Sequence, residues 1–428
     1  MKNDKEMLKA LEGILSIESV SVKGDAASPY GEGATKALGY MLELCQALGF
    51  RVKNCQNRIG YAEIGEGDTL VGILAHLDVV PAGSGWDFPP YACTRQEGKL
   101  YGRGISDDKG PAIACVYAMK DLLDSGLPLT KRIRIIFGLA EETGNWSDME
   151  FYKATEELPH FGFTPDASFP AIHGEKGIAH FTLSLPAEGS GLVSIRGGAA
   201  FNMVADSCTA VLKDRHGHNI TLEATGRSAH ASTPHQGENA ISKVMAQIAQ
   251  SKKLAPCPAA DFYNAVIGFD LHGQRAGCAL EDAQSGKLTL NVGKAEMREG
   301  QVVFSLDIRY PVTKTPAEVQ AGLAQAVTGY GATVALCSHQ EPVYMDAQGP
   351  WITTLMEAYR EVSGDTQARP EVMGGGTYAR AMANIVAFGP IFPGREHTEH
   401  QKNEYMLEED FLALRNIYRK ALEKALSL

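Results

Sequence analysis

A histidine and an aspartate, His76 and Asp78, follow a continuous apolar run at residues 70–75. Such a run predicts a strand buried on both faces, and open α/β sheets carry functional residues where such strands end. Positions i and i+2 of an extended chain point to the same side, so the Asp78 carboxylate could accept the second imidazole proton of His76. This contact would fix the tautomer of a metal-binding histidine. The alternative is a surface turn that closes the strand, which this pair alone does not exclude.

Two adjacent aspartates, Asp107 and Asp108, lie in a glycine-rich loop at residues 102–110. A helical pattern follows, and we expect the helix to begin near Pro111. Aspartate is a common N-cap, where it stabilises a helix end by about 1 kcal/mol. The other interpretation is a carboxylate that bridges two cations, in a loop whose glycines permit unusual backbone angles. The loop alone does not decide between them.

A pair of glutamates, Glu141 and Glu142, ends a second apolar run at residues 133–140. Two adjacent carboxylates in a cleft repel each other unless a positive charge is close. A bound cation would resolve this repulsion if one glutamate were a ligand and the other a free base for a metal-activated water. The alternative is a solvated acidic turn, which is less expected directly after an apolar run.

Two further clusters complete the candidate set. Asp166 lies between prolines in the segment 164–170, and His397 and His400 precede an Asn-Glu pair at 403–404. Each could belong to an ordinary polar loop. Each of the five clusters is weak evidence by itself. Together the clusters are stronger evidence for a site. Four of them lie at strand ends or in glycine- or proline-rich loops of the same predicted α/β domain.

The charges of the candidate ligands suit a dinuclear site. Three carboxylates and two neutral imidazoles, with one bridging hydroxide, give four negative charges against four positive charges from two Zn²⁺ ions. Nitrogen and oxygen donors in this number match the preferences of zinc, and Mn²⁺ or Co²⁺ could use the same ligands. The five candidate ligands are His76, Asp107, Glu142, Asp166 and His400.

The chain that must position these residues contains two kinds of sequence pattern. In residues 1–176 and 352–428, apolar runs alternate with helical patterns, which predicts a layered α/β domain with a mostly parallel sheet. Residues 177–351 differ and predict an inserted α+β domain. The strands expected in the insert are 181–185, 220–224, 288–292 and 302–308; its expected helices are 238–250 and 316–328, and 251–261 is expected to be a loop.

Composition and charge exclude some classes of protein and favour others. The 428 residues include 51 acidic and 40 basic ones, and the net charge of −11 disfavours nucleic acid and anionic membranes as partners. No apolar stretch approaches the roughly 18 residues of a membrane span, and charges interrupt the N-terminal segment where a secretion signal would need an apolar run. The 8 cysteines lack metal-binding spacing, so we expect reduced thiols and a cytoplasmic location.

The ordered motifs HLD, GRGxxDDKGP, AEETG, PDAxFP and HxxNE resemble the co-catalytic dinuclear zinc peptidases, a family that includes aminoacylase, glutamate carboxypeptidase and carnosinase. The resemblance covers essentially the whole chain. Within the family, the dipeptidase V branch of bacteria is most similar. The segments that indicate this branch are 197–206, 226–240, 306–311, 374–380 and 400–406.

The resemblance implies a role for each matching residue. Asp107 would bridge two metals, with His76 and Asp166 completing one site. Glu142 and His400, rather than His397, would complete the other. Glu141 would be the general base, Asp78 would orient His76, and a cis peptide bond would follow Asp107.

The resemblance also makes the insert at 177–351 a lid over the catalytic domain. His230 would then stabilise the oxyanion, and Arg309 would pair with the substrate carboxylate through a two-pronged contact. Without the resemblance, Asn202 and Arg309 would be taken as surface polar residues. The substrate-binding residues implied are Asn202, His230, Arg309, Gly375, Gly376 and Thr377.

The expected function is metal-dependent hydrolysis of dipeptides with free N- and C-termini. A hydroxide that bridges the metals would attack the amide carbon, with Glu141 as general base. The alternative on the same scaffold is an N-acyl amino acid or N-succinyl deacylase. A non-catalytic binding protein would have lost Glu141 or a ligand, and none is missing. The length of the insert favours a monomer.

Overall fold

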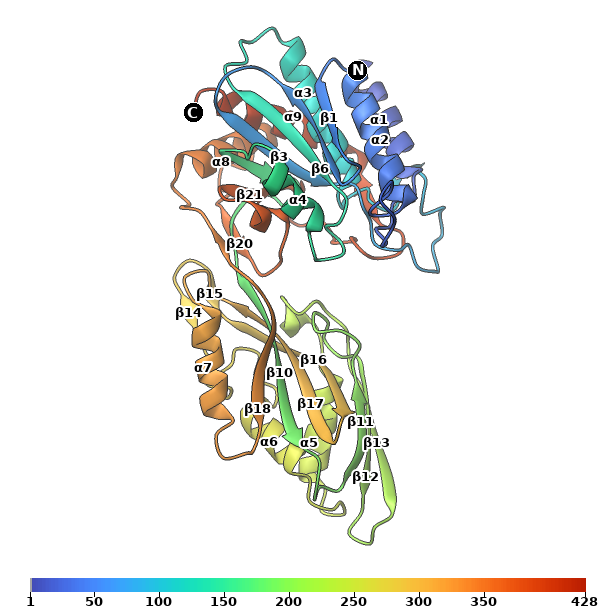
Figure 1. Cartoon of the computed structure of the whole chain (residues 1–428), viewed down its shortest axis with the longest axis vertical. Coiled ribbons are helices and arrows are strands. Elements are labelled where there is room, and N and C mark those ends of the chain that lie inside the picture. Colours follow the sequence, from blue (N-terminus) through green and yellow to red (C-terminus); the bar gives the residue numbers. More distant parts are fainter. Residues whose placement is uncertain (1) are drawn as a thin grey trace. The chain divides into compact units, whose positions relative to one another are not determined.

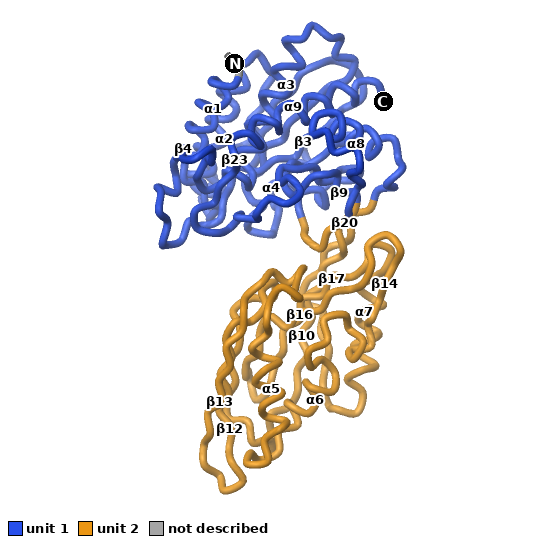
Figure 2. Tube along the Cα trace, turned by 180° about the vertical axis from the view of Figure 1, so that it is seen from behind, with its two compact units in different colours: residues 1–173, 345–371, 377–428 blue, residues 174–344, 372–376 orange. Residues whose placement is uncertain are grey.

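The computed structural model describes residues 2–428, which fold into two compact units (Figures 1 and 2). Unit 1 comprises residues 1–173, 345–371 and 377–428, and unit 2 comprises residues 174–344 and 372–376. The sequence puts the borders of the insert at 177 and 351. It does not anticipate that residues 372–376 return to unit 2, nor that the short strand β20 (Glu371–Met373) pairs with β9 (Ala171–Glu175) of the large sheet.

The large sheet of unit 1 is mixed. Its four central strands, in the order β6-β3-β7-β21, are mutually parallel. The pairs β1–β2, β2–β6 and β21–β9 are antiparallel, so the predicted parallel sheet describes the centre only. The sheet order ends in β9 and β19 (Val343–Tyr344). The remaining strands are β1 (Arg51–Cys55), β2 (Ile59–Ile64), β3 (Leu70–His76), β6 (Arg132–Gly138), β7 (Phe161–Thr164) and β21 (Ile385–Phe388).

Helices and short strands surround this sheet. Unit 1 contains α1 (Lys2–Leu15), α2 (Glu32–Ala47), α3 (Lys109–Asp124), α4 (Ser147–Thr155), α8 (Pro350–Ser363), α9 (Glu408–Ala425) and the 3-10 turn η2 (Tyr378–Ala381). A three-stranded sheet is formed by β4 (Thr94–Gln96), β5 (Lys99–Tyr101) and β23 (Tyr405–Leu407), and a two-stranded one by β8 (Ala167–Ser168) and β22 (Pro390–Ile391).

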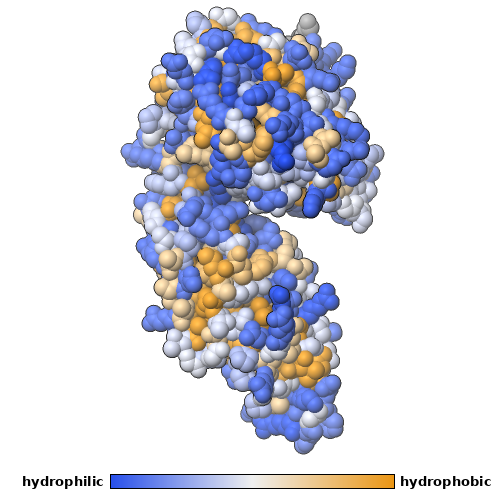
Figure 3. Space-filling model, in the orientation of Figure 1, coloured by the Kyte–Doolittle hydropathy of each residue, from blue (hydrophilic) through white to orange (hydrophobic). Residues whose placement is uncertain are grey.

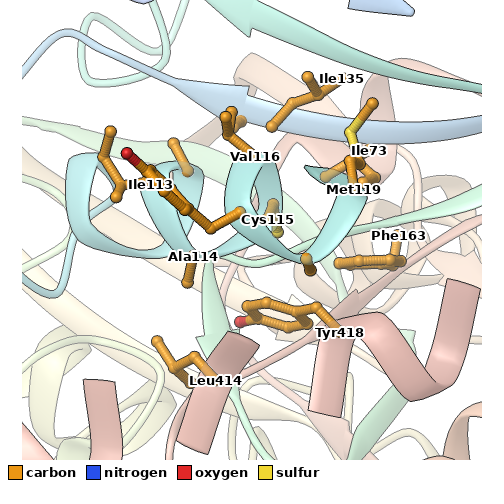
Figure 4. Packing of buried hydrophobic residues seen from close by; sticks show 14 of the residues in the cluster. Ile73, Ile113, Ala114, Cys115, Val116, Met119, Ile135, Phe163, Leu414 and Tyr418 are labelled. Atoms are coloured by element: carbon orange, nitrogen blue, oxygen red, sulfur yellow. The ribbon is translucent and has the colours of Figure 1, made fainter. Parts of the chain in front are cut away.

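The core of unit 1 is built around α3, which is apolar on almost every side. A helix of this kind is stable only when neighbours cover it all round. In Figure 4, Val116 and Met119 of α3 lie near the strand residues Ile73 and Ile135, and Leu414 and Tyr418 of α9 lie on the other side of the helix. Helix α3 is thereby held between the sheet and α9, which fixes the loop that leads into it.

The ends of the central strands determine where the candidate residues lie. In the register of the parallel strands β3 and β6, His76 lies opposite Gly138. The segments that follow, with Asp78 on one and Glu141 on the other, therefore leave the sheet at the same edge. Strand β7 ends at Thr164, so Asp166 follows at this edge too. This is the edge at which parallel α/β sheets carry their sites.

Unit 2 contains an antiparallel seven-stranded sheet with helices packed on it. Strand β10 alternates between fully and partly buried residues, which gives the sheet one core-facing side. The strand order is β13-β12-β11-β16-β17-β10-β18. The strands are β10 (Gly177–Pro186), β11 (Leu192–Gly197), β12 (Ser207–Lys213), β13 (Asn219–Thr225), β16 (Thr289–Arg298), β17 (Gln301–Tyr310) and β18 (Thr333–Gln340), with β14 (Glu281–Asp282) and β15 (Gly286–Lys287) as a separate pair; the helices are η1 (Pro234–Gln236), α5 (Ala240–Gln250), α6 (Pro258–Val266) and α7 (Pro316–Ala326).

The surface carries no broad apolar belt on the face drawn in Figure 3, where apolar residues gather in small groups among hydrophilic ones. Among the residues that the structure describes, no helix has the length and apolar character needed to cross a membrane.

Candidate metal centre

All five predicted ligands come together in unit 1. Among residues 2–428, two groups of three metal-ligating side chains place their ligand atoms within 4.8 Å of one another. The first group is His76, Asp107 and Asp166, and the second is Asp107, Glu142 and His400. Asp107 belongs to both groups. A carboxylate shared in this way is the arrangement that a bridging ligand requires.

The two oxygens of Asp107 face different histidines. Oδ1 lies 2.8 Å from Nε2 of His76, and Oδ2 lies 2.9 Å from Nε2 of His400. The same nitrogen of His76 is 3.8 Å from Oδ2 of Asp166, and that of His400 is 3.1 Å from Oε2 of Glu142. Imidazole nitrogens and carboxylate oxygens in this number fit two divalent cations of the zinc, manganese or cobalt type.

The electrostatics of the cluster favour the binding of positive charge. Burial and the nearby charge of Asp107 raise the pKa of Asp166 to about 7, and the same two causes raise the pKa of Glu142. Burial also raises the pKa of Glu141 well above its ordinary value, with Asp166 adding to the effect. The carboxylates therefore repel one another in a poorly solvated place, and cations between them would relieve that repulsion.

Asp78 does more than orient His76. Nδ1 of His76 lies 2.9 Å from the backbone oxygen of Asp78 and 3.5 Å from its carboxylate. The carboxylate instead accepts the backbone N–H groups of Glu141, at 3.2 Å, and of Glu142, at 3.0 Å. Asp78 thus fixes the ring of His76 chiefly through its carbonyl oxygen, while its side chain holds the glutamate pair.

The side chain of Asp108 does not cap helix α3. Asp108 occupies the N-cap position of α3, which begins at Lys109, close to the start predicted near Pro111, but its side chain makes no capping hydrogen bond. Oδ2 of Asp108 instead accepts the backbone N–H of His76 at 3.1 Å. The peptide bond between Asp107 and Asp108 is cis, as the family resemblance implies. The loop therefore connects the shared carboxylate to the end of β3.

Glu404 anchors the same loop from the C-terminal part of the chain. Its buried carboxylate accepts hydrogen bonds from Nη1 of Arg103 at 2.7 Å and from the backbone N–H groups of Gly104, at 3.1 Å, and Ser106, at 2.9 Å. The pairing of β23 with β5 brings the two segments together. The HxxNE motif contained this residue, but nothing in its spacing indicated the three donors.

His397 lies apart from both ligand groups. Its side chain is 66% exposed, and Nδ1 lies 3.1 Å from Oε1 of Glu399. Of the two candidate histidines, the structure therefore brings only His400 to Asp107.

A family model described as "Peptidase family M20/M25/M40" matches residues 72–424, the part of the chain that contains every residue of this centre. The chain belongs to this peptidase family. The family resemblance read from the motifs is thereby confirmed.

Relatives and solved structures of M20 peptidases agree with this assignment. The chain is 35% identical to "Putative dipeptidase YtjP" of Bacillus subtilis, over 99% of this chain and 97% of that protein. Its fold is similar to human carnosine dipeptidase 1, with a TM-score of 0.62, 17% identity and coverage of 99% and 97% of the two chains. It is equally similar to the M20 metallo-carboxypeptidase Sso-CP2 of Sulfolobus solfataricus, with a TM-score of 0.62, 18% identity and coverage of 99% and 100%. The molecule has the fold of these two peptidases.

The contacts of Glu404 give a first prediction for this M20 peptidase. In Glu404→Gln one acceptor oxygen is replaced by an N–H donor, so buried donors lose their partner. We expect the free energy of unfolding to fall by about 3 kcal/mol and zinc affinity to fall roughly tenfold, since the Asp107 loop is no longer held. Denaturant unfolding and calorimetric zinc titration measure the two effects.

Glu63→Gln is the matched control, because Glu63 forms a buried pair with Arg134 at 2.7 Å elsewhere in unit 1. We expect similar destabilisation in this variant but unchanged zinc affinity. Equal zinc affinities in the two variants would contradict the assignment of Glu404 to the centre.

Arg309, predicted to bind a substrate carboxylate, already makes a two-pronged contact in unit 2. Nε and Nη2 lie 2.6 and 2.8 Å from the two oxygens of Asp307, and Nη1 donates to the carbonyl of Gly374 at 3.0 Å. Both side chains are buried. The Asp-x-Arg spacing in a strand could have revealed this, because residues i and i+2 face the same side.

The other predicted lid residues lie in loops of unit 2. His230 and Asn202 are exposed, and Nδ1 of His230 lies 2.7 Å from Oγ of Ser232. The backbone oxygen of Asn202 accepts the N–H of Ala231 at 2.9 Å, which joins the two loops. The pair therefore forms one local structure, whose part in substrate binding stays a prediction.

The glycine-rich segment 374–377 runs between the two units. Gly375 and Gly376 belong to unit 2, and Thr377 belongs to unit 1. The buried hydroxyl of Thr377 accepts the N–H of Ala379 at 3.1 Å and caps η2. Thr377 thus has a structural contact of its own, and contact of this segment with substrate stays a prediction.

Proposed function

We propose that the protein hydrolyses dipeptides with free amino and carboxyl termini, with two zinc ions held by the two ligand groups and Glu141 as general base. The observation that carries the proposal is that Asp107 belongs to both groups of candidate ligands, with Glu141 next in the chain to one of them. The named relative at 35% identity supports the substrate class. A deacylase that acts on N-acyl or N-succinyl amino acids is the second candidate on the same scaffold.

The metals would be held by His76 and Asp166 on one side and by Glu142 and His400 on the other, with Asp107 shared. When bound, such cations supply Lewis acidity, which lowers the pKa of water and polarises the amide carbonyl. The donor set suits zinc and also accepts Mn²⁺ or Co²⁺.

Glu141 moves the protons. Its side chain belongs to neither ligand group, which leaves its carboxylate available. Its backbone is fixed at both ends, since its N–H is bound by Asp78 at 3.2 Å and its carbonyl oxygen accepts from the indole of Trp146 at 3.1 Å. Burial, with the charge of Asp166 adding to it, raises the pKa of Glu141 well above its ordinary value, and a raised pKa strengthens a carboxylate as a base. Glu141 takes a proton from the attacking water and then donates it to the leaving amine nitrogen.

Unit 2 would supply substrate contacts in this proposal. His230 would bind the developing oxyanion, Arg309 and Asn202 would bind the substrate, and the segment 374–377 would offer backbone amides to its carboxylate. This part rests on the family resemblance, as do the limit to two residues and the role of unit 2 as a lid. The monomeric state and the cytoplasmic location also stay predictions.

A substrate panel tests the proposal. Apoprotein reloaded with Zn²⁺ is expected to cleave free dipeptides, and to lose at least about tenfold in kcat/KM for N-acetylated or C-amidated forms, because each blocked end loses a charge-assisted contact. A chelator should abolish cleavage and added Zn²⁺ should restore it. Cleavage of only the N-acylated forms would instead identify the deacylase. Mn²⁺ and Co²⁺ reloading compares the metals.

A further inference from the structure

Four successive backbone N–H groups, from Leu139 to Glu142, point to two buried carboxylates. Asp78 binds the last two, as described above. Asp148 of helix α4 binds the first two through one oxygen, Oδ2, at 2.6 Å from Leu139 N and 3.0 Å from Ala140 N. The segment that carries the base and a ligand is thus held along its whole length by side chains rather than by a neighbouring strand.

Asp148 is in turn held by a tyrosine. The hydroxyl of Tyr378 donates to Oδ2 of Asp148 at 2.5 Å, and both side chains are completely buried. The N–H of Met149 binds the other carboxylate oxygen at 2.7 Å. These contacts fix the orientation of the Asp148 carboxylate, and in this orientation it accepts the N–H groups of Leu139 and Ala140.

The ring of Tyr378 reaches a metal ligand as well. It packs edge-on against the imidazole of His76, with 6.1 Å between centroids and an angle of 86°. It also packs against Trp146 at 5.7 Å, and the Trp146 indole binds the carbonyl oxygen of Glu141. Gly138 leaves room for the tyrosine, because a Cβ there would collide with the Tyr378 hydroxyl.

We propose that Tyr378 and Asp148 are positioning residues for the reaction, which set the places of Glu141, Glu142 and His76 without touching substrate. The inference rests on the proposed function of the centre. A displacement of reacting groups by about 1 Å can cost on the order of 100-fold in rate, so a buried pair that fixes this segment has a catalytic consequence. A tyrosine that only filled space in the core would have no such effect on the rate.

Tyr378→Phe tests the pair, because it keeps the ring and removes only the hydroxyl. At saturating Zn²⁺, we expect kcat for a dipeptide to fall at least about tenfold with KM nearly unchanged, and the affinity for one of the two Zn²⁺ ions to fall roughly tenfold because Glu142 shifts. Gly138→Ala, which displaces the intact tyrosine, should change kcat in the same direction.

Tyr152→Phe is the matched control. Tyr152 is also fully buried in unit 1, and its hydroxyl binds Arg134 at 2.7 Å and the carbonyl of Glu157 at 3.0 Å instead. We expect its kcat and zinc affinities to match the wild type. If Tyr378→Phe behaved like Tyr152→Phe in both measurements, the proposal would be overturned.

Asp148 provides a conservative comparison. Asp148→Asn keeps an oxygen that can accept the N–H groups of Leu139 and Ala140, so it should retain most of the kcat that Asp148→Ala loses. Equal losses of kcat in Asp148→Asn and Asp148→Ala would contradict the role of these hydrogen bonds. If the wild type cleaved no dipeptide, the proposed function would fail, whereas the zinc titrations of the two tyrosine variants would still decide the positioning role.

Discussion

Glu141→Gln is expected to lower kcat for dipeptide hydrolysis by about 10²- to 10⁴-fold, the usual contribution of a positioned general base, while two Zn²⁺ ions remain bound. Glutamine has the same shape but cannot take a proton from water. The backbone contacts of residue 141 to Asp78 and Trp146 do not involve its side chain and should persist. Steady-state kinetics at saturating Zn²⁺ and metal analysis by mass spectrometry measure the two quantities.

Glu142→Gln separates the two roles of the glutamate pair. Here we expect the loss of one bound Zn²⁺, since Glu142 belongs to the second ligand group and Glu141 to neither. If Glu141→Gln also lost a metal ion, or retained full activity, the assignment of the base to Glu141 would be wrong.

Asp107→Asn is expected to remove both metal ions. Asp107 is the member common to the two ligand groups, so its loss leaves two ligands in each. Asparagine offers one oxygen, whereas the two oxygens of Asp107 face His76 and His400 separately. Because a bound metal pair supplies several kcal/mol of transition-state stabilisation, kcat/KM should fall on the order of 10³-fold or more.

Asp166→Asn is the comparison for this variant, because Asp166 belongs to one group only. Calorimetric titration of each apoprotein with Zn²⁺ should give a stoichiometry near one for Asp166→Asn and no tight site for Asp107→Asn. Two tight sites in Asp107→Asn would contradict its role as the shared ligand.

Part of the candidate centre could be predicted because His76 and Glu142 follow continuous apolar runs. Strands buried on both faces appear in the sequence as continuous apolar runs, and the carboxyl ends of parallel strands lie at the same edge of the sheet. The sequence therefore predicts that His76 and Glu142 lie close together. Bridging by Asp107 and the choice of His400 came from the family resemblance, and the structure places both residues at the centre.

The supporting residues could not be found in this way. Asp148 lies in helix α4, and only tertiary contact shows that it binds the segment after β6. Glu404 likewise acts on a loop from the opposite end of the chain. In unit 2, the segment expected to be a loop at 251–261 contains the start of α6 at Pro258, a residue well suited to the first helical position. Strands β11, β12 and β18 were missed; each has several exposed residues, so polar side chains interrupt or shorten its apolar pattern.

The contact between Arg103 and Glu404 joins residues that are 301 positions apart. Domains form as units while a chain leaves the ribosome, and contacts between distant residues form late. Most of unit 2, residues 174–344, precedes the last two segments of unit 1 in the chain, so its core can form while His400 and Glu404 have yet to be synthesised. We therefore expect a nascent chain to assemble its second candidate ligand group only after residue 400 has been synthesised, so that hydrolytic competence arises later than the core of unit 2.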